Sequence, residues 1–160
     1  MEDTARAVME TRFFTVRPDL SIVEALRVFQ EASAQLRRQV FGLVVLDYRE
    51  QLVGMLSMYD ILLLIRPKHI HIWGGMTDLD LTGILNHACR QASRLLVNDI
   101  MTTDLITVTP DTHLLYIIDI MIKKHVRRLP VLENGKVLGL VYLSRVFQHL
   151  LEKFGHLSQD

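Results

Sequence analysis

The 160-residue sequence lacks the features that mark several classes of protein. It has a single cysteine, Cys89, which excludes an intramolecular disulfide, and no apolar N-terminal segment is typical of a secretory signal. We therefore expect a reducing, cytoplasmic location. The aliphatic run from Ile61 to Ile65 is far shorter than the roughly 18 residues that suggest a membrane span. The sequence thus predicts a soluble protein with no membrane partner.

A net charge is also absent. Lys plus Arg and Asp plus Glu number 18 each, so no overall field attracts nucleic acid or an anionic membrane. With 49% hydrophobic residues, the chain has the composition of one globular domain, or of two very small ones that share a core. A nucleic-acid partner is disfavoured, and any anion must bind locally.

The motifs of common enzymes are missing as well. The sequence has no glycine-rich phosphate loop with a lysine, no nucleophile elbow and no metal triad. His69 and His71 would share one face of an extended segment, but no carboxylate or thiolate completes a metal set. We expect no catalytic residue and no metal site, and interpret this segment as a surface or interface strand with Trp73 packed against a partner.

An internal repeat is the main feature that the chain does have. The stretch VMETRFFTVRPDLSIVEALRVF from Val8 matches IMTTDLITVTPDTHLLYIIDIM from Ile100, at an offset of 92 residues. Further on, LVGMLSMYDIL from Leu52 matches VLGLVYLSRVF from Val137, at an offset of 85. The first copy therefore holds seven extra residues, which we expect in EASAQLRRQVFG. Two copies that pack together would bury the surface that one small unit cannot.

This repeat predicts the domain organisation and the order of elements. Each copy has the pattern strand, helix, strand, strand, helix, and a Ser21/Glu24 capping box starts the first long helix. The predicted strands lie at 13–16, 43–46, 51–56, 105–108, 129–132 and 136–141, and a further helix at 81–95. The predicted regions are repeat 1 with a lead-in at 1–66, a spacer at 67–99, repeat 2 at 100–154 and a tail at 155–160.

Three stretches resemble the motifs of a known family, the tandem CBS (cystathionine β-synthase) domain pair, or Bateman module. They are GMLSMYD in the first copy, and DIMTTDLITVTPD and HVRRLPVLENGKVLGLV in the second. The resemblance implies an α+β fold of two pseudo-symmetric repeats packed through their sheets. It also implies an adenosine-containing regulatory ligand in a cleft between the repeats, association as a homodimer, and a role as a sensor that acts on another protein, without enzyme activity or a catalytic cofactor.

The family's ribose signature is glycine, two apolar residues, Ser or Thr, two further residues and Asp. Gly54, Ser57 and Asp60 satisfy it, and a carboxylate can accept hydrogen bonds from ribose hydroxyls. The same Ser-x-x-acid spacing is also typical of a capping box at a helix start. From spacing alone, capping is the favoured interpretation and ligand binding the alternative.

The second copy distinguishes these interpretations in part. It has Tyr142 and Arg145 in place of the serine and the aspartate, and Ser144 offers a displaced cap for its helix. Because the fold does not require the pair, the ligand interpretation of Ser57 and Asp60 gains weight. A guanidinium cannot accept hydrogen bonds from ribose. We therefore predict a degenerate second cleft.

Basic residues are concentrated in the second copy, immediately before a predicted strand. Arg127 and Arg128 could lie on a solvated helix end, where cations are favourable, but the family places basic residues here toward phosphates. The first copy has Phe41 and Gly42 instead. By this resemblance, the competent cleft consists of Ser57, Asp60, Ile106, Thr107, Arg127 and Arg128, and the degenerate cleft of Thr15, Tyr142 and Arg145.

The sequence leaves more than one function open. The first is a stand-alone module that senses AMP, ADP or ATP and acts on a separate effector protein by shifting between two arrangements. The alternatives are a structural dimerisation module whose ligand sites have decayed, or a sensor of S-adenosylmethionine.

Overall fold

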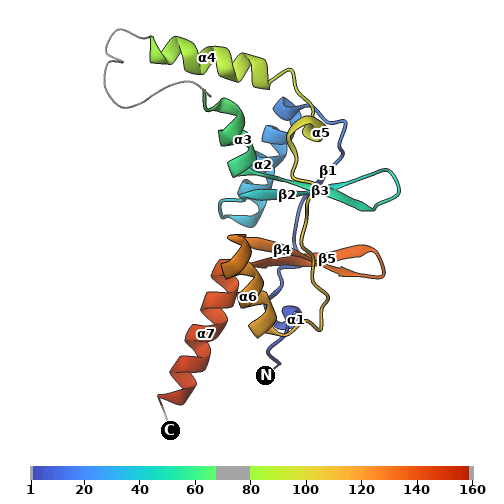
Figure 1. Cartoon of the computed structure of the whole chain (residues 1–160), viewed down its shortest axis with the longest axis vertical. Coiled ribbons are helices and arrows are strands. Elements are labelled where there is room, and N and C mark those ends of the chain that lie inside the picture. Colours follow the sequence, from blue (N-terminus) through green and yellow to red (C-terminus); the bar gives the residue numbers. More distant parts are fainter. Residues whose placement is uncertain (1, 68–79, 159–160) are drawn as a thin grey trace. The chain divides into compact units, whose positions relative to one another are not determined.

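The computed structural model describes residues 2–67 and 80–158, which form two compact units (Figure 1). We call residues 14–104 the first-repeat unit, and residues 1–13 together with 105–160 the second-repeat unit. The predicted segment with His69, His71 and Trp73 lies outside the described residues. The mixed α+β fold built from two repeats confirms the predicted fold class.

The first-repeat unit contains a three-stranded sheet in the order β1-β2-β3. Its strands are β1 (Thr15–Val16), β2 (Gly42–Leu46) and β3 (Leu52–Ser57), and its helices are α2 (Ile22–Leu36), α3 (Met58–Ile65), α4 (Leu81–Ala92) and α5 (Val97–Ile100). β1 runs parallel to β2, and β3 antiparallel to it. All five residues of β2 are buried, as expected for the central strand of a small sheet covered by helices.

The second-repeat unit contains the antiparallel pair β4 (Arg128–Glu133) and β5 (Lys136–Tyr142). Its helices are α1 (Ala5–Val8), α6 (Leu114–Lys124) and α7 (Leu143–Leu157). The strand predicted at 105–108 is wrong: only Val108 pairs there, through a single parallel bridge to Val131. Asn134 and Gly135 form the predicted hairpin turn with positive φ at both residues.

The two long helices show where the first copy carries most of its extra residues. Ser21 Oγ accepts a hydrogen bond from the Glu24 N–H at 3.2 Å and so starts α2, which confirms the serine half of the predicted box. α2 is four residues longer than α6, yet both end in a left-handed residue, Arg37 with φ 53° and His125 with φ 54°. One further helical turn therefore accounts for four of the seven extra residues.

The units do not coincide with the sequence repeats, because each repeat packs its lead-in against the other copy. α1 belongs to the first lead-in but packs with repeat 2, and α5 precedes repeat 2 but packs with repeat 1. The backbone hydrogen bonds correspond pair by pair at the 92-residue offset. They join Ala5 to Thr112 and Arg6 to Pro110 in one unit, and Val97 to Leu20 and Asn98 to Pro18 in the other.

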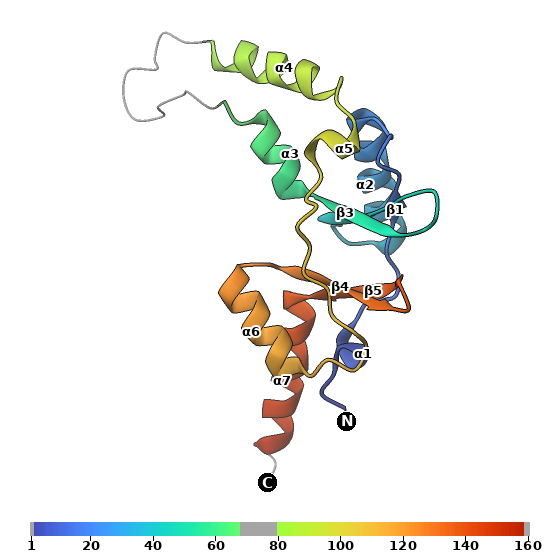
Figure 2. The ribbon, with the colours of Figure 1, turned by 45° about the vertical axis from the view of Figure 1, so that its right-hand side comes forward.

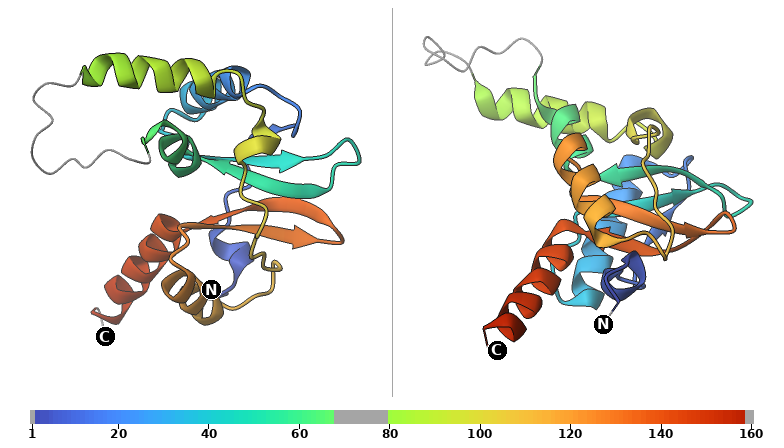
Figure 3. Two further views of the ribbon diagram at one scale, coloured as in Figure 1. Left: turned by 45° about the horizontal axis from the view of Figure 1, so that its top comes forward. Right: turned by 60° about the horizontal axis from the view of Figure 1, so that its bottom comes forward.

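The same exchange continues along the sheets. Glu10 forms an antiparallel bridge with Leu140 on β5, and Thr102 forms the equivalent bridge with Met55 on β3. In the left panel of Figure 3, the chain that leaves α5 crosses β3, where this single bridge forms. Each repeat therefore completes the sheet edge of the other copy. Sequence comparison identifies equivalent residues, but it cannot tell which copy a lead-in packs against.

A separate polar cluster joins the N-terminal segment to α7 inside the second-repeat unit. Asp3 contacts His149 Nε2 at 3.0 Å and Lys153 Nζ at 2.9 Å, both on α7. His149 is buried, and Figure 2 shows α1 beside α6 and α7. The hydrogen bonds from His149 and then Lys153 lower the pKa of the Asp3 carboxyl below its usual value.

Within the described ranges, no helix has both the length and the apolar character needed to cross a bilayer. The predicted helix in the spacer is confirmed as α4, although it ends at Ala92 and not at Leu95. Asp80 begins it by accepting a hydrogen bond from the Gly83 N–H at 3.0 Å.

Candidate functional site

The start of α3 holds the strongest candidate site. Ser57 is the last residue of β3 and the N-cap of α3, and its Oγ accepts a hydrogen bond from the Asp60 N–H at 3.1 Å. Asp60 Oδ2 in return accepts from the Ser57 N–H at 2.8 Å and the Ser57 hydroxyl at 2.9 Å. The predicted capping box is therefore present in full.

Asp60 also has a partner that capping does not require. The hydroxyl of Thr102 donates to Asp60 Oδ1 at 3.0 Å. Two backbone hydrogen bonds of 2.9 Å hold Thr102 beside Met55 on β3. Sequence reasoning missed Thr102, because 42 residues separate it from Asp60 and its position depends on the exchanged lead-in. The half-buried carboxylate is thus fixed by the two neighbouring segments of one unit.

Gly54 permits this close approach. A Cβ at this position would lie 2.7 Å from Met101 Sδ and 3.0 Å from the Thr102 carbonyl oxygen. Gly139 has the equivalent role in the second-repeat unit, where a Cβ would lie 2.6 Å from the Glu10 carbonyl oxygen. The glycine shared by both copies is therefore a packing requirement of the exchange as well as part of the ribose signature.

The equivalent position in the second-repeat unit lacks a carboxylate. Tyr142 is the N-cap of α7 and makes no side-chain capping bond, and Arg145 is exposed in the first turn. The predicted displaced cap at Ser144 is wrong, because Ser144 already lies inside the helix. α7 thus begins without such a cap. The fold tolerates this loss, since α7 is anchored by buried Val146 and His149.

The sheet register confirms which residues correspond in the two copies. Gly42 pairs with Ser57, and Arg128 pairs with Tyr142. The first N–H of α3 donates to the Phe41 carbonyl oxygen at 2.8 Å, and the first N–H of α7 donates to that of Arg127 at 2.9 Å. Arg127 and Arg128 therefore lie beside the helix start that has lost its serine and aspartate.

The remaining predicted site residues are divided between the units. The first-repeat unit holds Ser57 and Asp60, with Thr15 exposed on β1. The second-repeat unit holds exposed Arg127, half-buried Arg128, half-buried Ile106 and exposed Thr107, together with Tyr142 and Arg145. Their grouping into one competent and one degenerate cleft stays a prediction, because each predicted cleft combines residues of both units.

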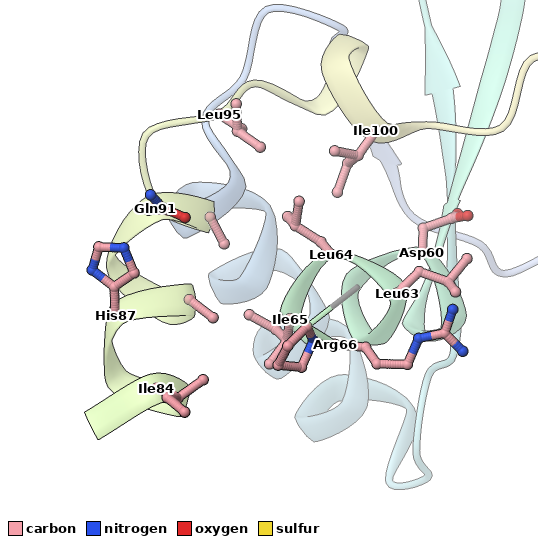
Figure 4. Close-up of a pocket in the computed structure, with 13 residues that line it drawn as sticks. Asp60, Leu63, Leu64, Ile65, Arg66, Ile84, His87, Gln91, Leu95 and Ile100 are labelled. Atoms are coloured by element: carbon pink, nitrogen blue, oxygen red, sulfur yellow. The ribbon is translucent and has the colours of Figure 1, made fainter. Parts of the chain in front are cut away.

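A cavity of about 660 Å³ lies within the first-repeat unit, between α3 and α4. In Figure 4, Leu95 and Ile100 extend toward Leu64 of α3, while the Asp60 carboxylate is directed toward the sheet. The walls are mainly aliphatic, and His87, Gln91 and Arg66 contribute the other polar groups. This aliphatic lining does not fit a phosphate site, because a phosphate needs several hydrogen-bond donors that converge on it.

The described part of the chain contains no cluster of three or more His, Cys, Asp or Glu residues that could hold a metal ion. Cys89 is exposed on α4.

Comparison with known proteins identifies the family. The CBS domain family model matches residues 5–67 and 97–152. The chain belongs to the CBS domain family. The two matches correspond to the two predicted repeats, so the CBS domains here occur as a tandem pair, as the resemblance implied.

Relatives of this CBS pair occur in distant organisms. An uncharacterized 17.7 kDa protein of Acidianus ambivalens is 26% identical over 158 residues, covering 96% of this chain and 79% of that protein. The chloroplastic CBS domain-containing protein CBSX2 of Arabidopsis thaliana is 29% identical over 144 residues, covering 86% of this chain but only 58% of the relative.

Solved CBS-pair structures share the fold. The crystal structure of Arabidopsis CBSX2 has a TM-score of 0.71 at 26% identity and covers 95% of this chain and 96% of that one. The structure of CBSX2 in complex with AMP has a TM-score of 0.68 at 28% identity, covering 93% and 97%. The cytosolic domain of the Mg²⁺ channel MgtE in complex with ATP matches with a TM-score of 0.67 at 22% identity, covering 92% and 49%.

Proposed function

We propose that this CBS pair is a regulatory module that binds an adenine nucleotide at one site per chain and modulates a partner protein. The observation that carries the proposal is the carboxylate of Asp60, which is fixed at the start of α3 by Ser57 and Thr102. A half-buried, oriented carboxylate is a strong acceptor for the hydroxyls of a ribose. The AMP complex of the similar protein CBSX2 supports this class of ligand.

In this proposal the two units contribute different parts of the site. Ser57 and Asp60 of the first-repeat unit hold the ribose, and Arg127 and Arg128 of the second-repeat unit bind the phosphates. Backbone groups at Ile106 and Thr107 meet the adenine. Because Tyr142 and Arg145 replace the serine and aspartate, the second cleft binds no ribose in the same manner.

The site has two distinct chemical tests. We expect calorimetric titration to show that the wild type binds AMP, ADP or ATP. Asp60→Ala should lower the affinity for AMP at least about tenfold, because the charge-assisted hydrogen bonds to the ribose are lost. Asp99→Ala is the matched control, because Asp99 also caps a helix, accepting from the Leu96 N–H at 2.8 Å. An equal loss of affinity in both variants would assign the effect to capping and contradict the proposed site.

The arginines are tested by removing the phosphate from the ligand. Arg127→Gln and Arg128→Gln should lower the affinity for AMP but leave the affinity for adenosine unchanged. Lys124 is an exposed cation at the end of α6, and Lys124→Gln should change neither affinity. If wild-type protein binds none of the three nucleotides, the decayed, purely structural module is the correct interpretation. Binding of S-adenosylmethionine alone would support the third alternative.

Association as a homodimer is part of the proposed function. α7 has an exposed stripe of large apolar side chains at helical spacing, comprising Leu143, Phe147, Leu151, Phe154 and Leu157. An exposed stripe of this kind is typical of an interaction surface. Light scattering should give a dimer mass for the wild type and a monomer mass for a Phe147→Ser, Phe154→Ser double variant. A monomeric wild type would contradict this part.

A further inference from the structure

The hydrogen bonds that Asp60 already accepts limit how many more its carboxylate can accept from a ligand. A carboxylate has about four lone-pair positions for hydrogen bonds. Among residues 2–67 and 80–158, the Ser57 N–H and hydroxyl take two on Oδ2, and the Thr102 hydroxyl takes one on Oδ1. These donors leave one position for a ligand. The vicinal 2′ and 3′ hydroxyls of a ribose need two positions if both donate to this carboxylate.

The three donors differ in how easily they can leave. The Ser57 N–H is fixed by the backbone at the helix start, and the Ser57 hydroxyl is held from both sides, because Oγ also accepts from the Asp60 N–H. Thr102 is exposed, and among the described residues its hydroxyl makes one side-chain hydrogen bond, to Asp60. Its backbone stays paired with Met55 whichever way the side chain turns. The Thr102 hydroxyl is thus the donor that yields.

We propose that Thr102 is a specificity-determining residue, which competes with the second hydroxyl of a vicinal diol for Asp60. The inference rests on the proposed nucleotide site and names what that site selects. A ligand with one ribose hydroxyl uses the free position and leaves Thr102 in place. A ligand with both hydroxyls must displace Thr102, so its additional hydrogen bond is largely offset by the one that is lost.

Such competition has an unusual consequence for mutation. Removing the Thr102 hydroxyl removes the competitor, so it strengthens binding of the diol and does not weaken it. Thr102→Val should raise the affinity for AMP about three- to tenfold, which is the range expected for one net hydrogen bond. The affinity for 2′-deoxy-AMP should stay within about twofold of the wild type, because that ligand never needed the second position.

The experiment is calorimetric titration of AMP and 2′-deoxy-AMP into the full chain. Thr102→Ala must reproduce the Thr102→Val result, and Thr102→Ser, which keeps a hydroxyl, must retain the wild-type ratio of affinities. Thr103→Val is the matched control, since Thr103 is exposed and its side chain makes no hydrogen bond within residues 2–67 and 80–158. This control should change neither affinity.

The outcomes separate this inference from the proposed function. Weaker AMP binding in Thr102→Val and Thr102→Ala would mean that Thr102 positions Asp60 and would overturn the competition. An equal change for both nucleotides would also overturn it. In either case the proposed function stands. If wild-type protein binds neither nucleotide, the proposed function fails and the inference fails with it.

Discussion

Glu10 and Leu140 exchange both of their backbone hydrogen bonds, at 2.8 and 2.9 Å. Gly139 lies next to this pair, and a Cβ there would meet the Glu10 carbonyl oxygen at 2.6 Å. We therefore expect Gly139→Ala to lower the free energy of unfolding by about 1–3 kcal/mol, because backbone must move to make room. Chemical denaturation followed by circular dichroism measures this change.

Gly155 provides the control for that variant. It lies in α7, and a Cβ at this position would contact nothing within 4 Å among the described residues beyond the adjoining backbone of its own helix. Gly155→Ala should therefore raise the unfolding free energy by about 0.5–1 kcal/mol through helix propensity. If both alanine variants change the unfolding free energy in the same direction, the Glu10 backbone does not approach Gly139 as closely as described.

The exchanged lead-ins predict where two equivalent core substitutions act. Val8 is buried in the core of the second-repeat unit, and Val97 in that of the first-repeat unit. Each change to Ala should cost about 1–3 kcal/mol from lost burial and a residual cavity. Hydrogen exchange should show Val8→Ala loosening β5, and Val97→Ala loosening β3. Loosening of β3 by Val8→Ala would contradict the exchange.

The cluster at Asp3 predicts an acid-sensitive part of the stability. His149 and then Lys153 lower the pKa of Asp3 in the folded state. A lowered carboxyl pKa contributes stability that is present above the unfolded value and is lost as pH falls below about 4 through the folded value. Asp3→Asn should therefore be less stable than wild type at pH 7.

The difference between Asp3→Asn and the wild type should shrink as the pH approaches the folded pKa of Asp3. Denaturation curves at pH 7 and pH 3 measure it. A difference that stays constant over this range would show that the carboxylate charge contributes nothing to docking of the N-terminal segment.

The left-handed residues that end α2 and α6 predict a pair of stabilising variants. Arg37 and His125 both have positive φ, which costs a residue with a Cβ more than it costs glycine. Arg37→Gly and His125→Gly should each raise the unfolding free energy by about 0.5–1 kcal/mol. Gln30→Gly, inside α2, should lower it by about 1 kcal/mol, and thermal melts compare the three.

The sequence predicts the repeat, most strands and the capping box of Ser57 and Asp60, because these depend on local spacing. It does not predict Thr102 as a partner of Asp60, since that contact depends on which copy the lead-in packs against. The false strand at 105–108 has a related cause: an apolar stretch closed by Pro-Asp fits an extended segment, but only Val108 reaches a partner strand. Local patterns define elements, and the pairing of distant segments decides their contacts.

The most direct test of the central claim is the stoichiometry of AMP binding to the wild-type chain at saturation. We predict one AMP per chain, because only the first copy retains the serine and the aspartate. We also predict that Asp60→Ala lowers the occupancy at a fixed AMP concentration near the wild-type Kd, while Asp99→Ala does not. Equilibrium dialysis measures both. Two bound AMP molecules per chain would contradict the claim. So would one bound AMP whose occupancy is the same in Asp60→Ala as in the wild type.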